Sequence, residues 1–182
     1  MGIKQVVKIG GSLFPDYAIE LAKQLKNTNS LIILGGGDFA NLIRKYDDEI
    51  HFSQETTHWT AIDCMDIIAK LVDDKVDSTK LAYSIAAYVS HFLNAKLLIV
   101  TNVNGIYTQE PKELGSTFIS KIDAKTLLTF QESSIDVMLP FLLLEFGTNC
   151  YVVNGKCPEW VLSLIDDNIN DYNFDYTQII GE

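Results

Sequence analysis

Residues 6–13, VVKIGGSL, combine a lysine, two glycines and a serine in a spacing that suits phosphate binding. The apolar run around Lys8 predicts a strand, and Gly10, Gly11 and Ser12 follow it as a turn before a helical pattern. Glycines allow backbone N–H groups to face an anion, and the next helix N-terminus adds its dipole. Lys8 would place a positive charge beside the same oxygens. A strand that ends in Gly-Gly is also a common tight turn, so this segment alone leaves both interpretations open.

A second glycine turn follows the next predicted strand. Residues 30–34, SLIIL, favour a buried strand that leads into Gly35, Gly36 and Gly37, and an amphipathic pattern covers residues 38–44. The carboxyl ends of parallel strands meet at one edge of a sheet, where ligands of open α/β proteins bind. We therefore expect both glycine turns to face one crevice, in which a phosphate donor and an acceptor could meet.

A third motif gives the chain a family resemblance. Residues 97–111, LLIVTNVNGIYTQEP, resemble a strand and loop that the amino acid kinase family writes roughly T-D-V-D-G-V-Y-x-x-D-P, and in that family the loop lies against the nucleotide. The opening residues 8–12, the glycines 35–37 and the late VVNG of residues 152–155 occur in the family's order. The resemblance therefore covers most of the chain.

The resemblance implies an ATP-dependent small-molecule kinase that transfers a phosphoryl group in line, without a phosphoenzyme. Such transfer depends mainly on positioning and charge neutralisation, and the implied role of Lys8 is to stabilise the transferring group. The implied nucleotide-binding residues are Gly10, Gly11, Ser12, Thr101, Asn102, Asn104, Gly105, Tyr107 and Pro111. The implied acceptor-binding residues are Gly35, Gly36, Gly37 and Asn154. Mg²⁺ is expected to be held by phosphates and water, without metal ligands from the protein.

Residues 58–66, HWTAIDCMD, narrow the resemblance within the family. This segment resembles the corresponding segment of the small archaeal-type kinases of methanofuran biosynthesis, which convert an aminomethyl-furanmethyl phosphate to its diphosphate. The implied acceptor is a phosphate, and a carboxylate is the other class considered. An alternative from the residues alone is that Trp59, Ile62 and Met65 form a core stripe at helical spacing.

Two positions depart from the family pattern. Tyr83 stands where relatives carry an aspartate that orients the catalytic lysines, and Phe141 stands where they carry a second lysine. Loss of one such electrostatic group commonly costs about 10²- to 10³-fold in rate. Asp77 could replace the aspartate only if the loop bends differently. A second function therefore stays open: an impaired, oligomeric nucleotide- or anion-binding member with a binding or regulatory role.

Strand and helix patterns alternate along the whole chain. The predicted strands are residues 5–9, 31–34, 96–101 and 149–153, and the predicted helices are residues 17–25, 59–72, 81–93 and 137–146. This alternation predicts one α/β domain over residues 1–182, a three-layer α/β/α sandwich with a mainly parallel sheet. Residues 45–80 contain no alternating run able to form a strand hairpin over the acceptor, so that site is expected to be open or closed by another subunit. Residues 166–182 are expected to contain an acidic turn and a short strand or docked segment.

Composition limits the partners. A formal net charge of −10 argues against nucleic acid, because phosphate backbones require clustered Lys and Arg. The cysteines Cys64, Cys150 and Cys157 form no CxxC pair, which is typical of reduced thiols, although a Cys150–Cys157 disulfide is an alternative. The longest apolar runs are too short to cross a bilayer and no leader pattern opens the chain, so we expect a cytoplasmic protein without a membrane partner.

One predicted helix is apolar enough to favour self-association. Ile62, Met65, Ile68, Leu71 and Val72 occur at helical spacing, and the small Ala69 would permit close approach of another helix. Large exposed apolar patches usually mark contacts, so a homodimer or higher homo-oligomer is expected. The alternative is that this helix packs against the sheet within one chain.

Overall fold

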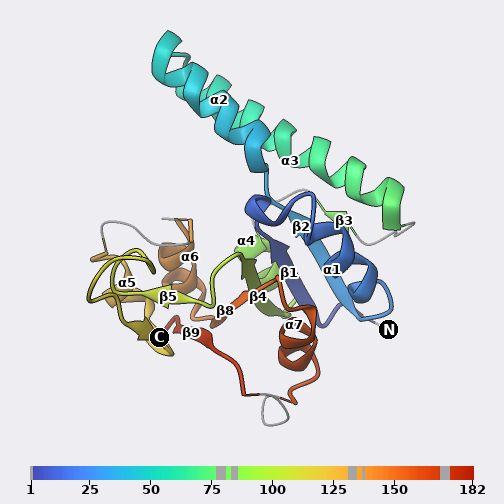
Figure 1. Cartoon of the computed structure of the whole chain (residues 1–182), viewed down its shortest axis with the longest axis vertical. Helices are drawn as coiled ribbons and strands as arrows, with labels where there is room; N and C mark the ends of the chain where they lie inside the picture. The colour runs from blue at the N-terminus through green and yellow to red at the C-terminus, as the bar shows by residue number, and fades with distance from the viewer. Residues whose placement is uncertain (1, 77–80, 83–85, 131–134, 137, 169–172) are drawn as a thin grey trace.

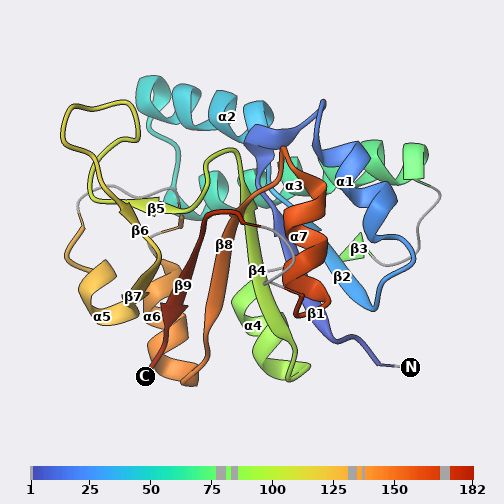
Figure 2. The same ribbon diagram turned by 60° about the horizontal axis from the view of Figure 1, so that its bottom comes forward.

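The computed structural model describes residues 2–76, 81–82, 86–130, 135–136, 138–168 and 173–182. It has a seven-stranded sheet in the order β3-β2-β1-β4-β8-β9-β7, and helices cover both faces (Figures 1 and 2). The sheet strands are β1 Gln5–Ile9, β2 Ser30–Leu34, β3 Leu81–Ala82, β4 Lys96–Thr101, β7 Lys121–Asp123, β8 Cys150–Asn154 and β9 Tyr176–Ile180. The strands from β3 to β8 run parallel, and β9 runs antiparallel to β8. The predicted α/β/α sandwich with a mainly parallel sheet is confirmed.

The helices form two layers around separate apolar clusters. Helices α1 Ala18–Leu25, α3 Gln54–Val76 and α7 Pro158–Ile165 pack on one face, and α4 Ala86–Phe92, α5 Ala124–Leu127 and α6 Met138–Phe146 pack on the other. The alternation of β1 divides its side chains between these clusters, with Val7 and Ile9 in the first and Val6 in the second. Lys8 therefore lies on the same face of the sheet as Val6, towards α4 and α6.

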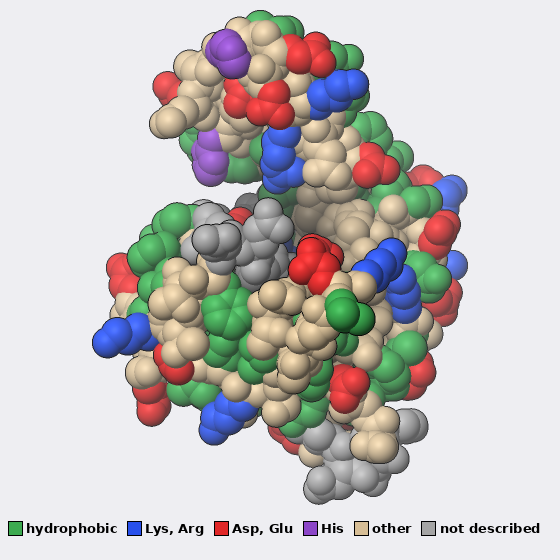
Figure 3. Space-filling view, turned by 60° about the vertical axis from the view of Figure 1, so that its left-hand side comes forward, with side chains coloured by type: hydrophobic (Ala, Val, Ile, Leu, Met, Phe, Trp, Pro, Cys, Tyr) green, Lys and Arg blue, Asp and Glu red, His purple; other side chains and the backbone are tan. Residues whose placement is uncertain are grey.

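A helical hairpin projects from this body. Helix α2, Gly37–Ile50, follows β2 and packs along α3, and the pair extends away from the sheet (Figure 1). No strand hairpin was expected in residues 45–80, and their described part, residues 45–76, is mainly helical. In the space-filling view, the surface is hollowed between this hairpin and the body (Figure 3).

The four predicted strands match β1, β2, β4 and β8 to within one residue. The helix predicted over residues 81–93 is wrong at its start, because Leu81 and Ala82 pair in parallel with Ile32 and Ile33 of β2. The helix begins only at Ala86. The short strand expected near the C-terminus is confirmed as β9.

The burial of α3 corrects the expected association surface. Ile68, Ala69 and Val72 are buried in the core cluster that also contains α1, so they cannot contact a partner. Leu71 stays 45% exposed. Among the described residues, no helix is both long and apolar enough to cross a bilayer.

Candidate active site

The two glycine turns lie at the same edge of the sheet and touch. Ile9 of β1 is level with Leu34 of the parallel β2, so both turns leave the sheet side by side. A Cβ built on Gly11 would lie 2.1 Å from the backbone nitrogen of Gly37, and one on Gly35 would lie 2.5 Å from that of Gly11. Glycine is therefore required at Gly11 and Gly35 by contact between the turns, whatever ligand they bind.

Gly10 and Gly36 have packing roles of their own. The N–H of Gly10 donates to the carbonyl of Val100 at 2.7 Å, which joins the first turn to β4. A Cβ on Gly36 would lie 2.6 Å from the Cβ of Ala40 and 3.4 Å from that of Cys64, so α2 and α3 close over this turn. The hairpin is thus fixed directly on the second glycine turn.

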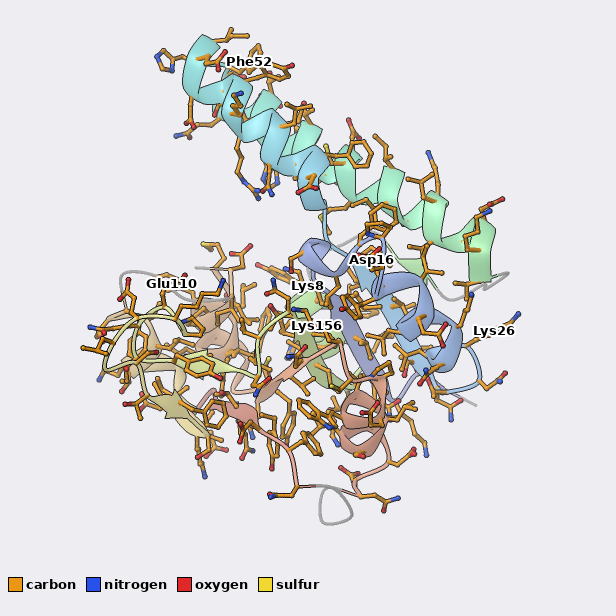
Figure 4. The ribbon with its side chains drawn as sticks, viewed as in Figure 1. Lys8, Asp16, Lys26, Phe52, Glu110 and Lys156 are labelled. Carbon is orange, nitrogen blue, oxygen red and sulfur yellow. The ribbon has the colours of Figure 1, made fainter. Side chains whose placement is uncertain are left out.

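Lys8 is a half-buried cation at the carboxyl end of β1. It lies level with Ile33 of β2 and Ile99 of β4, two apolar neighbours that cannot neutralise it. No carboxylate oxygen among the described residues lies within 4.0 Å of its Nζ. Burial raises the pKa of the Cys150 thiol, and the positive charge of Lys8 opposes part of that rise. Figure 4 shows Lys8 at the edge of the body nearest the hairpin. This lysine is available to an anion at the same edge.

A cavity of about 1020 Å³ opens beside the first glycine turn. Its volume is close to the upper end of the range of about 300–1,000 Å³ that is typical of small-molecule sites. Six of the nine expected nucleotide residues line it: Ser12, Thr101, Asn102, Gly105, Tyr107 and Pro111. Val103, residues 108–110, residues 112–113, Thr129 and Phe130 complete the lining. The structure thus brings together the first turn and the loop after β4.

The floor of the cavity is held by Thr177 of β9. Its buried hydroxyl accepts from the N–H of Ile106 at 2.8 Å and donates to the carbonyl of Ile119 at 2.5 Å. A Cβ on Gly105 would lie 2.4 Å from this oxygen, so the loop passes only because residue 105 is glycine. These bonds fix β5, Ile106–Tyr107, against β6, Phe118–Ile119.

Tyr107 and the following loop form one wall. The ring of Tyr107 meets Phe118 edge to face, with 5.4 Å between centroids. Burial raises the pKa of Tyr107 and the negative charge of Asp175 raises it further, so the phenol stays neutral and can donate a hydrogen bond. Within the loop, Ser116 Oγ donates to the carbonyl of Gln109 at 3.0 Å. The wall is therefore organised without ligand.

Asn104 and Asn154 bond to each other and are not among the cavity-lining residues. Asn154 Nδ2 donates to Asn104 Oδ1 at 2.9 Å, and Asn104 Nδ2 donates to Asp175 at 3.4 Å. Asn154, expected on the acceptor side, thus joins the end of β8 to the loop after β4. Gly10 and Gly11 are also not among the cavity-lining residues; Ser12 is the residue of the first glycine turn that lines the cavity.

The lining includes residues that sequence reasoning missed. Glu110 and Lys112 bring charge to the rim, and Glu110 is visible beside the cavity loop in Figure 4. Thr129 and Phe130 come from the end of α5, where no sequence pattern suggested a ligand. Within the described residues, no three His, Cys, Asp or Glu side chains are grouped to hold a metal ion.

The departures from the family pattern have different outcomes. Phe141 lies in α6 with 53% of its surface exposed, and its apolar ring stands where the family resemblance implies a lysine. Tyr83 and Asp77 lie outside the described residues. Lys156 lies two residues after the end of β8, and its Nζ lies 5.9 Å from the centroid of the Tyr17 ring.

Comparisons of the sequence with known proteins identify its family. The profile of the amino acid kinase family matches residues 76–154. The chain is 31% identical over 220 aligned residues to a [5-(aminomethyl)furan-3-yl]methyl phosphate kinase of Methanocaldococcus jannaschii, and the alignment covers 97% of each protein.

Solved structures share the fold. The uridylate kinase of Archaeoglobus fulgidus superposes with a TM-score of 0.73 at 17% identity, over 97% of this chain and 99% of its own. The UMP kinase of Ureaplasma parvum gives 0.73 at 15% identity, over 99% of both chains. The aspartate kinase of Synechocystis gives 0.70 at 11% identity, over 98% of this chain and 40% of its own. By its sequence and its fold, the chain belongs to the amino acid kinase family.

Proposed function

We propose that this protein is an ATP-dependent kinase that phosphorylates a phosphate monoester to a diphosphate. The observation that carries the proposal is the placement of Lys8, without a carboxylate partner among the described residues, at the sheet edge where the first glycine turn leads to the cavity. The similarity to the M. jannaschii kinase supports an aminomethyl-furanmethyl phosphate as the acceptor. A carboxylate acceptor, as in the aspartate kinase with the same fold, is the other class to be tested.

The chemistry of a phosphate acceptor suits the residues present. A phosphate monoester has a second pKa near about 6, so at neutral pH its oxygen is already deprotonated. This oxygen would bond to the γ-phosphorus while the bond to the β–γ bridging oxygen breaks, and ADP leaves with that electron pair. Because no proton has to be removed, the reaction needs positioning and positive charge more than a general base.

The residues of the site divide these tasks. Lys8 would lie against the transferring phosphoryl group, where its positive charge stabilises the negative charge spread over the phosphoryl oxygens in the transition state. Ser12, Thr101 and Asn102 present hydroxyl and amide groups to the donor phosphates, and the wall around Tyr107 would exclude water from the nucleotide. Bound Mg²⁺, held mainly by phosphate oxygens and water, would neutralise the phosphates.

The test is turnover with MgATP and a panel of acceptors. The panel contains [5-(aminomethyl)furan-3-yl]methyl phosphate, UMP and aspartate, and ADP release is measured with wild type and Lys8→Met. We expect turnover only with phosphate monoesters, and a loss of at least about 10²-fold in Lys8→Met with an unchanged melting temperature. Equal rates in the two proteins would remove Lys8 from the mechanism.

The second candidate function is nucleotide or anion binding without catalysis. Phe141 favours it, because a cation expected in the site is missing. Binding stabilises a folded protein by RT ln(1 + [L]/Kd). If the melting temperature rises with ATP and no acceptor is turned over, the protein is a family member that binds nucleotide without catalysis.

We also propose that the chain forms a homodimer in a reducing, cytoplasmic compartment, which its three free thiols would suit. Of the 14 residues of α2, only Ala40 is buried, and an apolar stripe along this helix stays more than two-fifths exposed: Phe39, Leu42, Tyr46 and Ile50. A second copy of this projecting hairpin could cover the stripe. Sedimentation should give a dimer that Leu42→Asp dissociates, whereas a wild-type monomer at all concentrations would contradict the proposal.

A further inference from the structure

Side-chain hydrogen bonds join three neighbouring strands of the sheet behind the cavity. Asn104 lies in the loop after β4, Asn154 ends β8, and Asp175 directly precedes β9. Asn154 Nδ2 donates to Asn104 Oδ1 at 2.9 Å, and Asn104 Nδ2 donates to Asp175 Oδ2 at 3.4 Å. These three side chains, the amide bridge, thus connect residues that are 50 and 71 positions apart in the sequence.

The backbone fixes the direction of the amide bridge at one end. The N–H of Lys156 donates to Asn154 Oδ1 at 3.0 Å, so the Nδ2 of the same amide is the group that faces Asn104. Asn104 therefore presents its oxygen to Asn154, and its own Nδ2 is left to donate to Asp175. Residue 104 has to accept at one end and donate at the other, whereas an aspartate of the same shape could only accept.

Asn104 lies behind the cavity wall and is not part of the lining. Its two chain neighbours, Val103 and Gly105, line the cavity, and so does Asn102. Asn104 itself is half-buried, and its amide is directed at other side chains of the protein. An effect of Asn104 on a ligand therefore passes through the loop that carries it.

This loop is anchored through its backbone on either side of Asn104. Before it, the carbonyl of Thr101 accepts from the N–H of Gly155 at 2.8 Å. After it, the N–H of Ile106 donates to the hydroxyl of Thr177 at 2.8 Å. Between these anchors, Asn104 adds a side-chain attachment to the end of β8 and the start of β9.

The segment after β8 also touches the first glycine turn. A Cβ built on Gly155 would lie 2.6 Å from Leu13 Cδ1. Leu13 ends the short 3₁₀ helix Gly11–Leu13, which contains the cavity-lining Ser12. The amide bridge therefore connects the two sides of the cavity, the loop that carries Asn102 and the turn that carries Ser12.

We propose that Asn104 is a positioning residue for ATP, which holds the loop after β4 in place relative to the first glycine turn through Asn154 and Asp175. The inference rests on the proposed kinase function and extends it, because it assigns the spacing between the two groups of donor-binding residues to the amide bridge. Residue 104 must then be an amide. A carboxylate there would lose the bond to Asp175 and place two like charges together.

The test measures ATP binding by titration calorimetry, without acceptor, for Asn104→Asp, Asp175→Asn and the double variant. Asn104→Asp should weaken ATP binding about 5- to 20-fold, because repulsion replaces a hydrogen bond to a charged group. Asp175→Asn should weaken it about threefold at most, since an amide oxygen still accepts from Asn104. In the double variant the donor and the acceptor exchange places, so most of the loss should be recovered.

Two further variants complete the comparison. Asn149→Asp is the matched control, because it adds the same charge at the opposite end of β8 and keeps the oxygen that accepts from the N–H of Gly181 at 3.2 Å. It should bind ATP as wild type does. Asn104→Ser removes both bonds without adding charge, and should give a smaller loss than Asn104→Asp. If Asn104→Asp does not fold, an unchanged ATP affinity in Asn104→Ser would overturn the proposal.

Steady-state kinetics separate positioning from a general loss of structure. In Asn104→Asp, the KM for ATP should rise about 5- to 20-fold, while the KM for [5-(aminomethyl)furan-3-yl]methyl phosphate and the melting temperature stay within error of wild type. A rise of both KM values together with a lower melting temperature would overturn the positioning role.

The outcomes also distinguish this inference from the proposed function. Unchanged ATP binding in Asn104→Asp, or a double variant as weak as Asn104→Asp, would overturn the role of Asn104 and leave the kinase intact. A loss that Asp175→Asn recovers, in a protein that turns over no acceptor, would retain the positioning role and overturn the kinase. A wild type that does not bind ATP would overturn both.

Discussion

Alanine substitutions at glycines test the contact between the two glycine turns, since the glycines differ in the space available for a Cβ. A Cβ on Gly11 would lie 2.1 Å from the backbone of Gly37, and a Cβ on Gly35 would lie 2.5 Å from the backbone of Gly11. A Cβ on Gly10 would lie 3.0 Å from a carbonyl oxygen, whereas a Cβ on Gly2 would have no other atom within 4 Å. Backbone cannot move aside as a flexible side chain can. Overpacking of a core typically costs about 1–3 kcal/mol, and the first two substitutions belong at or above the upper end of that range.

These costs convert into measurable melting temperatures. A protein of this size loses about 2–4 °C per kcal/mol. Gly11→Ala and Gly35→Ala should therefore melt at least about 6–12 °C below wild type, and Gly10→Ala about 2–4 °C below it. Gly2→Ala is the matched control and should be unchanged. The assay is thermal unfolding without nucleotide, so that loss of binding does not contribute. Equal melting temperatures for Gly11→Ala and Gly2→Ala would refute the close contact.

Further predictions concern the missing lysine, the cavity floor and the thiols. Phe141→Lys restores a cation at a half-exposed position, so kcat should rise by up to about 10²-fold, and a fall in kcat with an unchanged fold would contradict this. Thr177→Val leaves the N–H of Ile106 unpaired, which should cost about 1–3 kcal/mol and weaken ATP binding in titration calorimetry; unchanged stability would be inconsistent with the bonds described. Cys157 should be alkylated first in the native protein, although burial and Glu159 raise its pKa, while Cys150, buried with a strongly raised pKa, should react only on unfolding. The pKa of Cys150 is raised in the folded state, so the contribution of this thiol to stability should be full below about pH 8.5, the usual thiol pKa, and should decline as the pH rises further. Wild type should therefore lose more stability between pH 8 and pH 10 than Cys150→Ala does. An equal change in the two proteins would argue against this linkage.

The sequence was sufficient for the fold and for the shared sheet edge of the two glycine turns. Strongly apolar strands that end in glycine turns predicted β1 and β2 and their common edge, because buried parallel strands have the clearest local pattern. The start of α4 was not predictable, since β3 is only two residues long and exists through its pairing with β2. The contact of Gly11 with Gly37, the role of Thr177 beneath Gly105, and the place of Phe130 in the cavity depend on distant segments that no local pattern connects.

The hairpin shows the same limit of local reasoning. The sequence predicted no strand hairpin in residues 45–80, and the described part, residues 45–76, is mainly helical, but the spacing of Ile68 and Val72 did not reveal whether they face a partner or the sheet. Apolar residues at helical spacing predict that one face of a helix is buried, but they do not show which part of the protein, or which partner, covers that face.

The most direct test of the central proposal is phosphorus NMR of the protein with MgATP and [5-(aminomethyl)furan-3-yl]methyl phosphate. We expect the monoester signal to be replaced by two coupled diphosphate signals and ADP to appear in equal amount, and we expect neither change with Lys8→Met. Release of inorganic phosphate alone, or an unchanged monoester signal in wild type under conditions where ATP demonstrably binds, would contradict it.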